Sequence, residues 1–238
     1  YPGAEEICDD GIDQNCNGSD SLTPTIEPLE SQEICEGTSV QLNATAANFD
    51  QIQWTTSGDG TFSDTTTLTP IFTPGVQDII NSFIILTIEV SNQCGSVTSE
   101  LTLSITQNPT VDAGADITIC QDGTASLSAT ATDFASVQWT MTGGNGNLVN
   151  DTSLNAQYVS TPTDVGPIFL TVTVTPNDAN GVPCGSSVSD TTTIFIEASP
   201  TVDAGPSIEV CEGPFQITGA SASNFEQLQW TTSGDGTF

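Results

Sequence analysis

The stretch EICEGTSVQLNATAANFDQIQWTT, residues 33–56, returns twice more in closely related form. Residues 118–141 read TICQDGTASLSATATDFASVQWTM, and residues 209–232 read EVCEGPFQITGASASNFEQLQWTT. Each copy has a cysteine near its start and a tryptophan near its end, and the spacing between these two residues is the same in all three copies. Recurrence of this kind indicates a tandem array of one structural unit.

The repeats predict four parts in the chain. Each repeat begins at a Pro-Thr pair, and these pairs start at Pro24, Pro109 and Pro200. The predicted parts are an acidic loop at 1–23, complete repeats at 24–108 and 109–199, and the beginning of a third repeat at 200–238. A portion as short as the last lacks the strands that would cover its apolar face, so we expect further residues or a neighbouring copy to complete it.

Apolar and polar residues alternate within each repeat, which is the pattern of half-buried β-strands. The apolar set of the first repeat is Val40, Leu42, Ala44, Ala46, Ile52, Trp54, Ile84, Leu86, Ile88, Val90, Leu101, Leu103 and Ile105. The matching set of the second is Leu127, Ala129, Val137, Trp139, Ile168, Leu170, Val172, Val174, Ile194 and Ile196. Glycine-rich turns separate the runs, and no helical period is sustained. The pattern predicts an all-β fold of tandem immunoglobulin-like β-sandwiches, each with a buried tryptophan.

The composition excludes several classes of function. The chain has no Lys, Arg or His against 30 acidic residues, so its formal charge is −30. Without cations it cannot neutralise phosphates, which excludes nucleic acid as a partner. No apolar run is long enough to insert into a membrane. Serine–histidine and cysteine–histidine catalytic sites cannot be built, so only paired carboxylates or a bound metal could do chemistry.

The cysteines recur at matching positions in the two complete repeats. Cys35 and Cys120 lie early, and Cys94 and Cys184 lie before the last predicted strand. We therefore predict the disulfides Cys35–Cys94 and Cys120–Cys184, with the partner of Cys211 beyond residue 238. Disulfides place the protein outside the reducing cytoplasm, in a secreted or cell-surface location. Free buried thiols are the alternative, which the matched pairs disfavour.

The N-terminal segment YPGAEEICDDGIDQNCNGSDS has the composition of a metal-binding loop. Short oxygen-bearing side chains at alternate positions, followed by glycine, are typical of loops that wrap a calcium ion. The candidate ligands are Asp9, Asp10, Asp13, Asn15, Asn17 and Asp20. A disulfide between Cys8 and Cys16 would staple this loop. The alternative is an acidic linker with a local disulfide and no ion.

Both regions resemble known families. The form ExCDDGxDxNCxG is similar to the aspartate-rich metal-binding motif of large secreted bacterial proteins, related in style to thrombospondin type-3 calcium repeats. That resemblance implies that the matching Asp and Asn residues are ligands, with part of the motif lying upstream. The phrases PTVDAGADITIC, QWTTSGDGTF and VSNQCGSV resemble the PKD-like tandem repeats of giant surface proteins in gliding and marine Bacteroidota. This second resemblance implies export by type IX secretion and a role in adhesion or surface filaments.

Several triplets match glycosylation signals. Asp20-Ser21-Leu22, Asp64-Thr65-Thr66 and Asp190-Thr191-Thr192 resemble the O-glycosylation signal of Bacteroidota. Asn43 and Asn150 open N-type sequons. The candidates are therefore Ser21, Thr65, Thr191, Asn43 and Asn150. Chance occurrence in a Thr-rich β protein is the alternative.

Three functions remain open. The first is a non-enzymatic structural region of an extracellular bacterial fibre, filament or adhesin stalk, whose partners are neighbouring copies or further repeats, with surface glycans or other cells as further candidates. The second is a carbohydrate-binding module, which would need exposed aromatic platforms. The third is a carboxylate-based glycoside hydrolase. The recurrence of every tryptophan at one apolar strand position favours the first.

Overall fold

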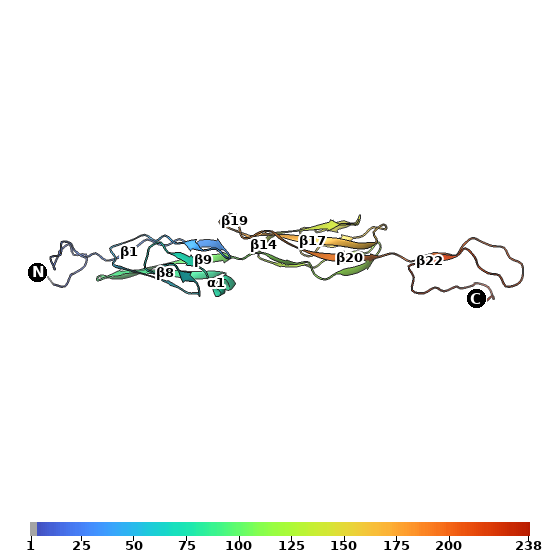
Figure 1. Ribbon diagram of the computed structural model, residues 1–238, viewed down its shortest axis with the longest axis horizontal. Coiled ribbons are helices and arrows are strands. Elements are labelled where there is room, and N and C mark those ends of the chain that lie inside the picture. Colours follow the sequence, from blue (N-terminus) through green and yellow to red (C-terminus); the bar gives the residue numbers. More distant parts are fainter. Residues whose placement is uncertain (1–3) are drawn as a thin grey trace. The chain divides into compact units, whose positions relative to one another are not determined.

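The computed structural model describes residues 4–238, and strands dominate it (Figure 1). The first sequence repeat contains β1 (Thr25–Ile26), β2 (Gln32–Cys35), β3 (Val40–Gln41), β4 (Ala46–Ala47), β5 (Gln51–Thr56), β6 (Thr61–Phe62), β7 (Ile71–Thr73), α1 (Val76–Asn81), β8 (Phe83–Asn92) and β9 (Gly95–Thr106). The second contains β10 (Thr110–Asp112), β11 (Ile117–Cys120), β12 (Thr124–Ser126), β13 (Thr130–Thr132), β14 (Phe134–Thr142), β15 (Asn147–Val149), β16 (Gln157–Val159), β17 (Gly166–Pro176), β18 (Asp178–Ala179), β19 (Val182–Pro183) and β20 (Val188–Glu197). Residues 200–238 contain β21 (Thr201–Asp203) and β22 (Ser221–Ser223).

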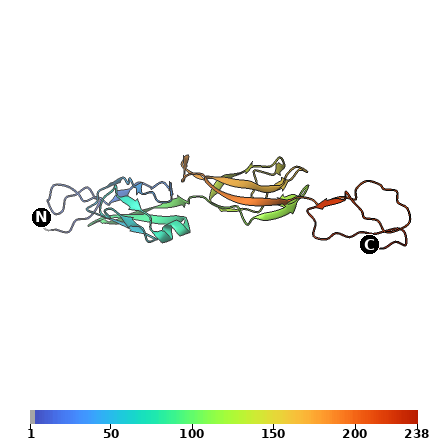
Figure 2. The same ribbon diagram turned by 45° about the vertical axis from the view of Figure 1, so that its right-hand side comes forward.

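The same sheet topology recurs in the two complete repeats. The first has a four-stranded sheet in the order β2-β9-β8-β5 and a three-stranded sheet in the order β3-β7-β6. The second has the corresponding orders β11-β20-β17-β14 and β12-β16-β15. In Figures 1 and 2, β8 lies beside β9 and β17 beside β20. The predicted tandem immunoglobulin-like β-sandwich fold is confirmed.

The chain folds into two compact units whose limits differ from those of the sequence repeats. Unit 1 holds the described residues through Thr110, with Ala131–Ser136 and Val174–Val188. Unit 2 holds Val111–Thr130, Val137–Thr173 and Ser189–Phe238. The hairpin of β18 and β19 is therefore part of unit 1, although it comes from the second sequence repeat. The four-part division itself stays a prediction.

Strand register explains the first core. β5 and β8 are antiparallel and place Trp54 opposite Ile88, while β8 and β9 place Leu86 opposite Leu101. These side chains point to one face, and they belong to a single buried cluster that extends from Val40 to Ile105. Burying each large apolar side chain contributes about 1.5–3 kcal/mol, so the alternation seen in the sequence supplies the main favourable contribution to folding of this sandwich.

The second core repeats the first. Trp139 is buried like Trp54, and each indole N–H donates to a backbone carbonyl oxygen. The acceptors are the oxygens of Thr67 at 2.9 Å and Ser153 at 3.0 Å. The apolar residues predicted for both cores are buried or pack against buried residues, with Val174 buried at the end of β17.

The short helix α1 was not expected from the sequence. The N–H groups of Gln77 and Asp78 both donate to the Asp59 carboxylate at 3.2 Å. The Asp78 carboxylate in turn accepts the N–H of Gly75 at 3.1 Å. Carboxylates therefore accept three of the open N–H groups at the start of this helix. So short a helix cannot display a helical period in the sequence. No helix within residues 4–238 has the length and apolar character needed to span a lipid bilayer.

Candidate functional site

Residues 4–23 of the N-terminal loop form a series of turns without strands. Four residues in this range take positive φ: Asp9 at 64°, Gly11 at 76°, Cys16 at 59° and Gly18 at 114°. Glycine, and to a lesser degree Asp and Asn, tolerate this conformation, so the Gly- and Asp-rich composition permits the tight turning. Of the predicted loop 1–23, residues 1–3 lie outside the described part of the chain.

Three predicted ligands accept hydrogen bonds from nearby backbone N–H groups. Asp13 accepts the N–H groups of Asn17 at 3.0 Å and Gly18 at 2.6 Å. The Asn15 side-chain oxygen accepts the N–H of Asn17 at 2.9 Å, and the Asn17 oxygen accepts that of Ser19 at 3.2 Å. Such local side chain to backbone bonds are the reason Asp and Asn favour turns. The structure therefore brings Asp13, Asn15 and Asn17 into one turn.

Asp20 has an oxygen without a protein partner. Its Oδ2 accepts the N–H of Gly11 at 2.8 Å, which ties the two sides of the loop together. Its Oδ1 is buried and has no hydrogen-bond partner. A buried carboxylate oxygen without a donor is costly, so this atom is where a cation would be accommodated best.

Asp9 and Asp10 are used elsewhere in the loop. Asp9 Oδ1 accepts the N–H of Thr23 at 3.1 Å. Asp10 accepts the N–H of Ile12 at 2.8 Å and the side-chain amide of Gln14 at 2.6 Å. Among the described residues, no three Asp, Glu or Cys side chains gather as a metal-binding group. The predicted carboxylates thus share one loop but do not converge on one point.

Two acidic residues that are not among the predicted ligands also lie in or beside the loop. Glu6 accepts the N–H groups of Gln14 at 3.2 Å and Asn15 at 3.3 Å, so it closes the loop from its N-terminal side. Asp50 lines a polar hollow together with Asp20 and Asn92. The spacing of calcium loops gave no signal for Asp50, because it comes from the first sequence repeat. Glu6 precedes an Ile-Cys pair as Glu33 does in the first repeat, and this match in the sequence could have identified Glu6 as part of the loop.

The loop is attached to the β8–β9 hairpin. Cys8 forms a disulfide with Cys94, with a Cα–Cα distance of 5.8 Å. The side-chain amide of Asn92 donates to the carbonyl oxygen of Leu22 at 2.8 Å, and that of Gln93 contacts the Ser21 hydroxyl. The predicted Cys8–Cys16 staple is therefore wrong, and Cys16 is exposed and outside any disulfide of the described chain.

The other two predicted disulfides are also wrong, and strand direction explains why. Cys35 is opposite Thr106, the last residue of β9, whereas Cys94 immediately precedes its first residue. The length of β9 therefore separates these cysteines by roughly 35 Å. Likewise Cys120 is opposite Glu197 at the end of β20, while Cys184 precedes that strand.

The structure instead pairs Cys35 with Cys184, with a Cα–Cα distance of 5.0 Å. Cys184 follows β19 and is fully buried within unit 1. Cys120 and Cys211 are exposed, and neither forms a disulfide within residues 4–238.

The glycosylation candidates differ in accessibility. Asn43, Asn150 and Thr191 are exposed, whereas Ser21 and Thr65 are partly buried. The hydroxyl of Thr191 shares a hydrogen bond of 2.9 Å with that of Thr171. All five sites stay predictions.

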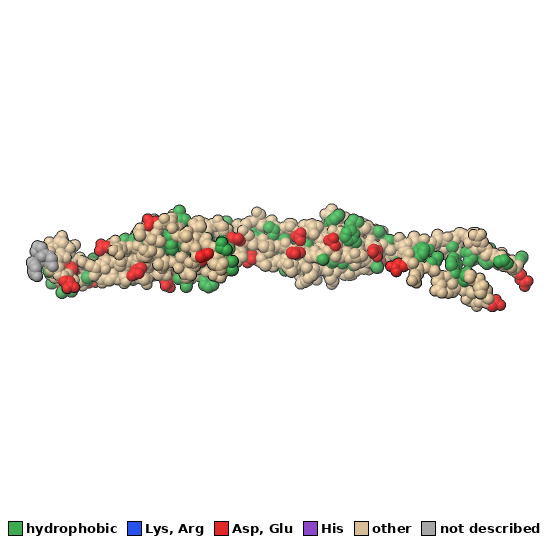
Figure 3. All heavy atoms as spheres, turned by 60° about the horizontal axis from the view of Figure 1, so that its bottom comes forward, with side chains coloured by type: hydrophobic (Ala, Val, Ile, Leu, Met, Phe, Trp, Pro, Cys, Tyr) green, Lys and Arg blue, Asp and Glu red, His purple; other side chains and the backbone are tan. Residues whose placement is uncertain are grey.

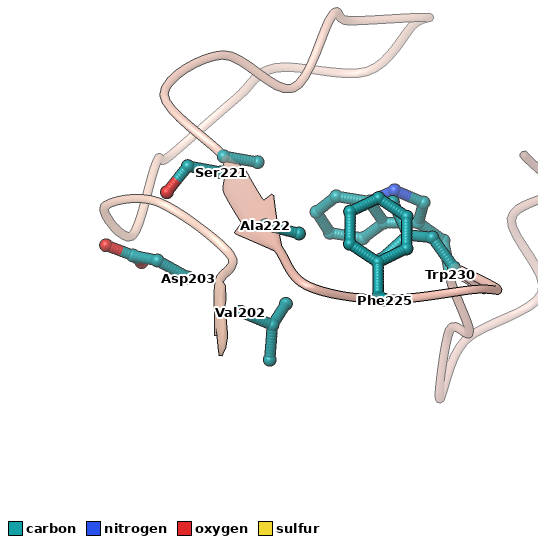
Figure 4. A pocket seen from close by; sticks show the side chains of 8 residues that line it. Val202, Asp203, Ser221, Ala222, Phe225 and Trp230 are labelled. Atoms are coloured by element: carbon teal, nitrogen blue, oxygen red, sulfur yellow. The ribbon is translucent and has the colours of Figure 1, made fainter. Parts of the chain in front are cut away.

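The tryptophans offer no repeated sugar-binding platform. Trp54 and Trp139 are each only 1% exposed, whereas Trp230 is 39% exposed. Figure 4 shows Trp230 beside Phe225 in an apolar pocket whose other residues include Val202.

The buried carboxylates have structural partners. Asp78 accepts the N–H groups of Asp59 at 3.1 Å and Gly60 at 2.8 Å. Asp59 is itself a hydrogen-bond acceptor, and the N–H of Gln77 makes the largest contribution to lowering the pKa of its carboxyl. A carboxyl held ionised in this way is poorly suited to act as a general acid. On the face shown in Figure 3 the acidic side chains are scattered.

Comparisons with known proteins bear on the loop and on the fold. A family model described as "Putative metal-binding motif", whose name refers to copper, matches residues 1–21. Among solved structures, the chain is similar to mouse cadherin-23 EC22-24 at 15% identity and a TM-score of 0.52, over 75% of this chain and 67% of that one. It is also similar to an I-band fragment of titin at 14% identity and a TM-score of 0.47, with the same two coverages. No curated protein matches the sequence.

Proposed function

We propose that this chain is a non-enzymatic structural region of an extracellular bacterial fibre, filament or adhesin stalk. The observation that carries this proposal is the Cys35–Cys184 disulfide, which fastens residues of one sequence repeat to a hairpin from the next. Tandem immunoglobulin-like domains are typical of structural and adhesion proteins. Its partners would be further repeats or neighbouring copies, with glycans or other cells bound elsewhere.

Covalent connections suit a chain that carries load. Cys8–Cys94 joins the loop to the first repeat, and Cys35–Cys184 closes a segment with a sequence separation of 149 residues. The two closed segments overlap, so the shortest covalent path runs along residues 8–35 and then crosses the Cys35–Cys184 bond, and a pulling force cannot draw out the rest of the enclosed chain unless a disulfide breaks. The chain also has no Lys or Arg, so trypsin-like proteases find no cleavage site. Both properties favour a role outside the cell.

We further propose that the N-terminal loop holds calcium. All candidate ligands offer oxygen, which hard cations such as calcium prefer. Neither His nor Met is present in the loop to favour copper. Asp20 Oδ1, with no protein donor, would be the first ligand, and Asp13 would follow. The bound ion would offset repulsion among the acidic residues of the loop and hold it against the β8–β9 hairpin.

Labelling of intact cells tests the fibre proposal. Antibodies against residues 24–199, followed by gold-labelled electron microscopy, should mark structures that project beyond the cell envelope. Cells permeabilised before labelling are the control, and they should show no additional internal population. Labelling that requires permeabilisation, or purified protein that hydrolyses polysaccharides, would contradict the proposal.

Calorimetry tests the metal proposal. The metal-stripped chain should bind calcium, and Asp20→Asn should weaken that binding by about tenfold or more. Glu89→Gln removes the same charge from an exposed position on β8 and is the matched control. Equal calcium binding by both variants would show that the loop is not the site.

A further inference from the structure

The cysteines of this chain fall into two local types. Cys8, Cys35, Cys120 and Cys211 each follow Ile or Val and precede a glycine-containing turn, in EEICDDG, QEICEGT, ITICQDG and IEVCEGP. Cys94 and Cys184 each begin the triplet Cys-Gly-Ser near the final hairpin of a repeat. We call these the turn cysteines and the hairpin cysteines. Both disulfides join one cysteine of each type.

Each disulfide joins two consecutive parts of the chain rather than two cysteines of the same part. The hairpin cysteine of the first repeat, Cys94, is bonded to the turn cysteine of the preceding acidic loop, Cys8. The hairpin cysteine of the second repeat, Cys184, is bonded to the turn cysteine of the first repeat, Cys35. Each hairpin cysteine therefore reaches back to the part before its own. By the same rule, the turn cysteine of the second repeat, Cys120, should form a disulfide with the hairpin cysteine of a third repeat.

The contacts around Cys35 show how the first repeat binds the β18–β19 hairpin. The side-chain amide of Asn180, in the β18–β19 turn, donates to the carbonyl oxygen of Glu33 at 2.8 Å. Gly185 follows the hairpin cysteine with φ at 92°, and a Cβ there would lie 2.6 Å from the side-chain oxygen of Asn108. Glycine is thus required after the cysteine for both backbone and steric reasons. The backbone reason applies to both Cys-Gly-Ser triplets, since Gly95 takes a φ of 135°.

Cys120 occupies the same strand position as Cys35. Cys35 ends β2, which runs parallel to β9 and places the cysteine opposite Thr106. Cys120 ends β11, which runs parallel to β20 and places it opposite Glu197. In both cases the cysteine lies where its repeat's last strand ends.

The turns after these two cysteines also match. The N–H of Glu36 donates to Thr106 at 2.9 Å, and that of Gln121 donates to Glu197 at 3.0 Å. The Glu36 side chain accepts the N–H of Asn108 at 3.1 Å, and the Gln121 side chain accepts that of Ser199 at 2.7 Å. The receiving surface is therefore built in the second repeat as it is in the first. Cys120 nevertheless stays exposed, because no described hairpin covers it.

We propose that Cys120 is the disulfide attachment site for the Cys-Gly-Ser hairpin of a further repeat of the same kind. The disulfides then form a regular series along the array, with each repeat locked to the one before it. Cys211 would serve the following repeat in the same way. This inference rests on the tandem array of the proposed function and adds a covalent rule for its assembly.

The chemistry is an ordinary two-electron oxidation. The Cys120 thiol and the hairpin thiol lose two protons and two electrons as the S–S bond forms. A thiol–disulfide oxidoreductase outside the reducing cytoplasm accepts them, and its own disulfide is reduced to a dithiol.

Disulfide mapping of the native protein tests the proposal. Native material is alkylated without reduction and digested with proteases that cut at acidic or apolar residues, because the described sequence has no trypsin site. We expect Cys120 in a disulfide with a peptide from outside residues 1–238 that contains Cys-Gly-Ser. A free Cys120, or a bond to Cys16 or Cys211, would overturn the proposal. An array found on the cell surface with free Cys120 would leave the fibre function standing, so the two failures are distinguishable.

A peptide probe tests the receiving surface on the 238-residue chain. The probe is residues 174–187, VTPNDANGVPCGSS, activated at its cysteine as a pyridyl disulfide. The Cys120 thiolate attacks the peptide sulfur, and pyridinethione leaves and is measured by absorbance. Docking should make the reaction about tenfold or more faster at Cys120 than at Cys16 or Cys211.

Two controls complete the probe experiment. Activated glutathione, which cannot dock, should react without preference for Cys120. A probe carrying Asn180→Ala should lose most of the preference, since it cannot make the bond to the strand carbonyl. Equal rates at all three cysteines with the intact probe would overturn the receiving surface.

Discussion

The carboxylate of Asp164 accepts a hydrogen bond from the hydroxyl of Tyr158 at 3.0 Å, and both residues are buried in the second repeat. Asp164 also accepts the N–H groups of Asn145 at 2.7 Å and Thr161 at 2.8 Å. It thereby holds the glycine-rich turn at 143–146. In the first repeat Asp78 holds the equivalent turn through Gly60, so each complete repeat buries one carboxylate for the same purpose.

Replacing Asp164 with Asn should lower the free energy of unfolding by about 1–3 kcal/mol, because an amide cannot accept all of these donors. Denaturant unfolding followed by tryptophan fluorescence measures the change. The control is Glu197→Gln, at an exposed position on β20. A surface substitution of this kind should change stability by no more than about 0.5 kcal/mol. Equal effects of the two substitutions would contradict the structural role of Asp164.

The contribution of Asp164 should depend on pH. Burial raises the pKa of its carboxyl, but the N–H groups of Thr161 and Asn145 together with hydroxyl donors outweigh burial and lower it overall. Because the folded state binds the proton more weakly, the stabilisation is present above the ordinary carboxyl pKa of about 3.9 and disappears as pH falls through the lower folded value. The difference in unfolding free energy between the wild type and Asp164→Asn should therefore shrink below about pH 4. A difference that grows on acidification would contradict this sign.

The three tryptophans should respond differently to truncation. Trp54→Ala and Trp139→Ala should each cost about 3–5 kcal/mol, because each leaves a cavity in a closed core. Trp230 is 39% exposed. Its replacement by Ala should therefore cost less than about 1 kcal/mol. Thermal unfolding of the three variants provides a matched comparison at one repeat position, and a large loss for Trp230→Ala would show that residues 200–238 form a closed core.

Gly60 and Gly236 occupy the same position in two copies of QWTTSGDGTF but differ in surroundings. A Cβ at Gly60 would lie 2.7 Å from the carbonyl oxygen of Thr73, whereas nothing lies within 4 Å of one at Gly236. Gly60→Ala should therefore destabilise the protein by about 1–3 kcal/mol, and Gly236→Ala should be neutral. Chemical denaturation distinguishes them, and equal stability would exclude the predicted clash.

Single cysteine variants separate the observed loop disulfide from the one expected. Cys8→Ser should release the loop from the β8–β9 hairpin, lower the melting temperature of the protein and reduce its free energy of unfolding by about 2–4 kcal/mol. Cys16→Ser should have little effect on either quantity. Calcium affinity should follow the same order. If Cys8 and Cys16 were bonded to each other, the two substitutions would have equal effects.

The N-terminal loop was only partly predictable. Spacing of Asp13, Asn15 and Asn17 along the chain identified a turn, because these short side chains bond to backbone groups a few residues away. The spacing could not identify the buried Asp20 oxygen that has no hydrogen-bond partner, or the hollow that Asp20 and Asp50 both line. Those features depend on contacts between the loop and a distant part of the chain.

The sequence by itself determined the tandem immunoglobulin-like fold and the core, because the alternation of apolar and polar residues is a local property of each strand. Trp54 and Trp139 each mark the inward face of the strand that carries them. Only the tertiary structure decided how the cysteines pair. Matching positions suggested Cys35 with Cys94, but the parallel pairing of β2 with β9 places them at opposite ends of that strand. A disulfide forms only where the two Cα atoms lie within roughly 7 Å of each other. For Cys35 that proximity follows from strand direction and from the placement of a hairpin far along the chain, which local spacing does not encode.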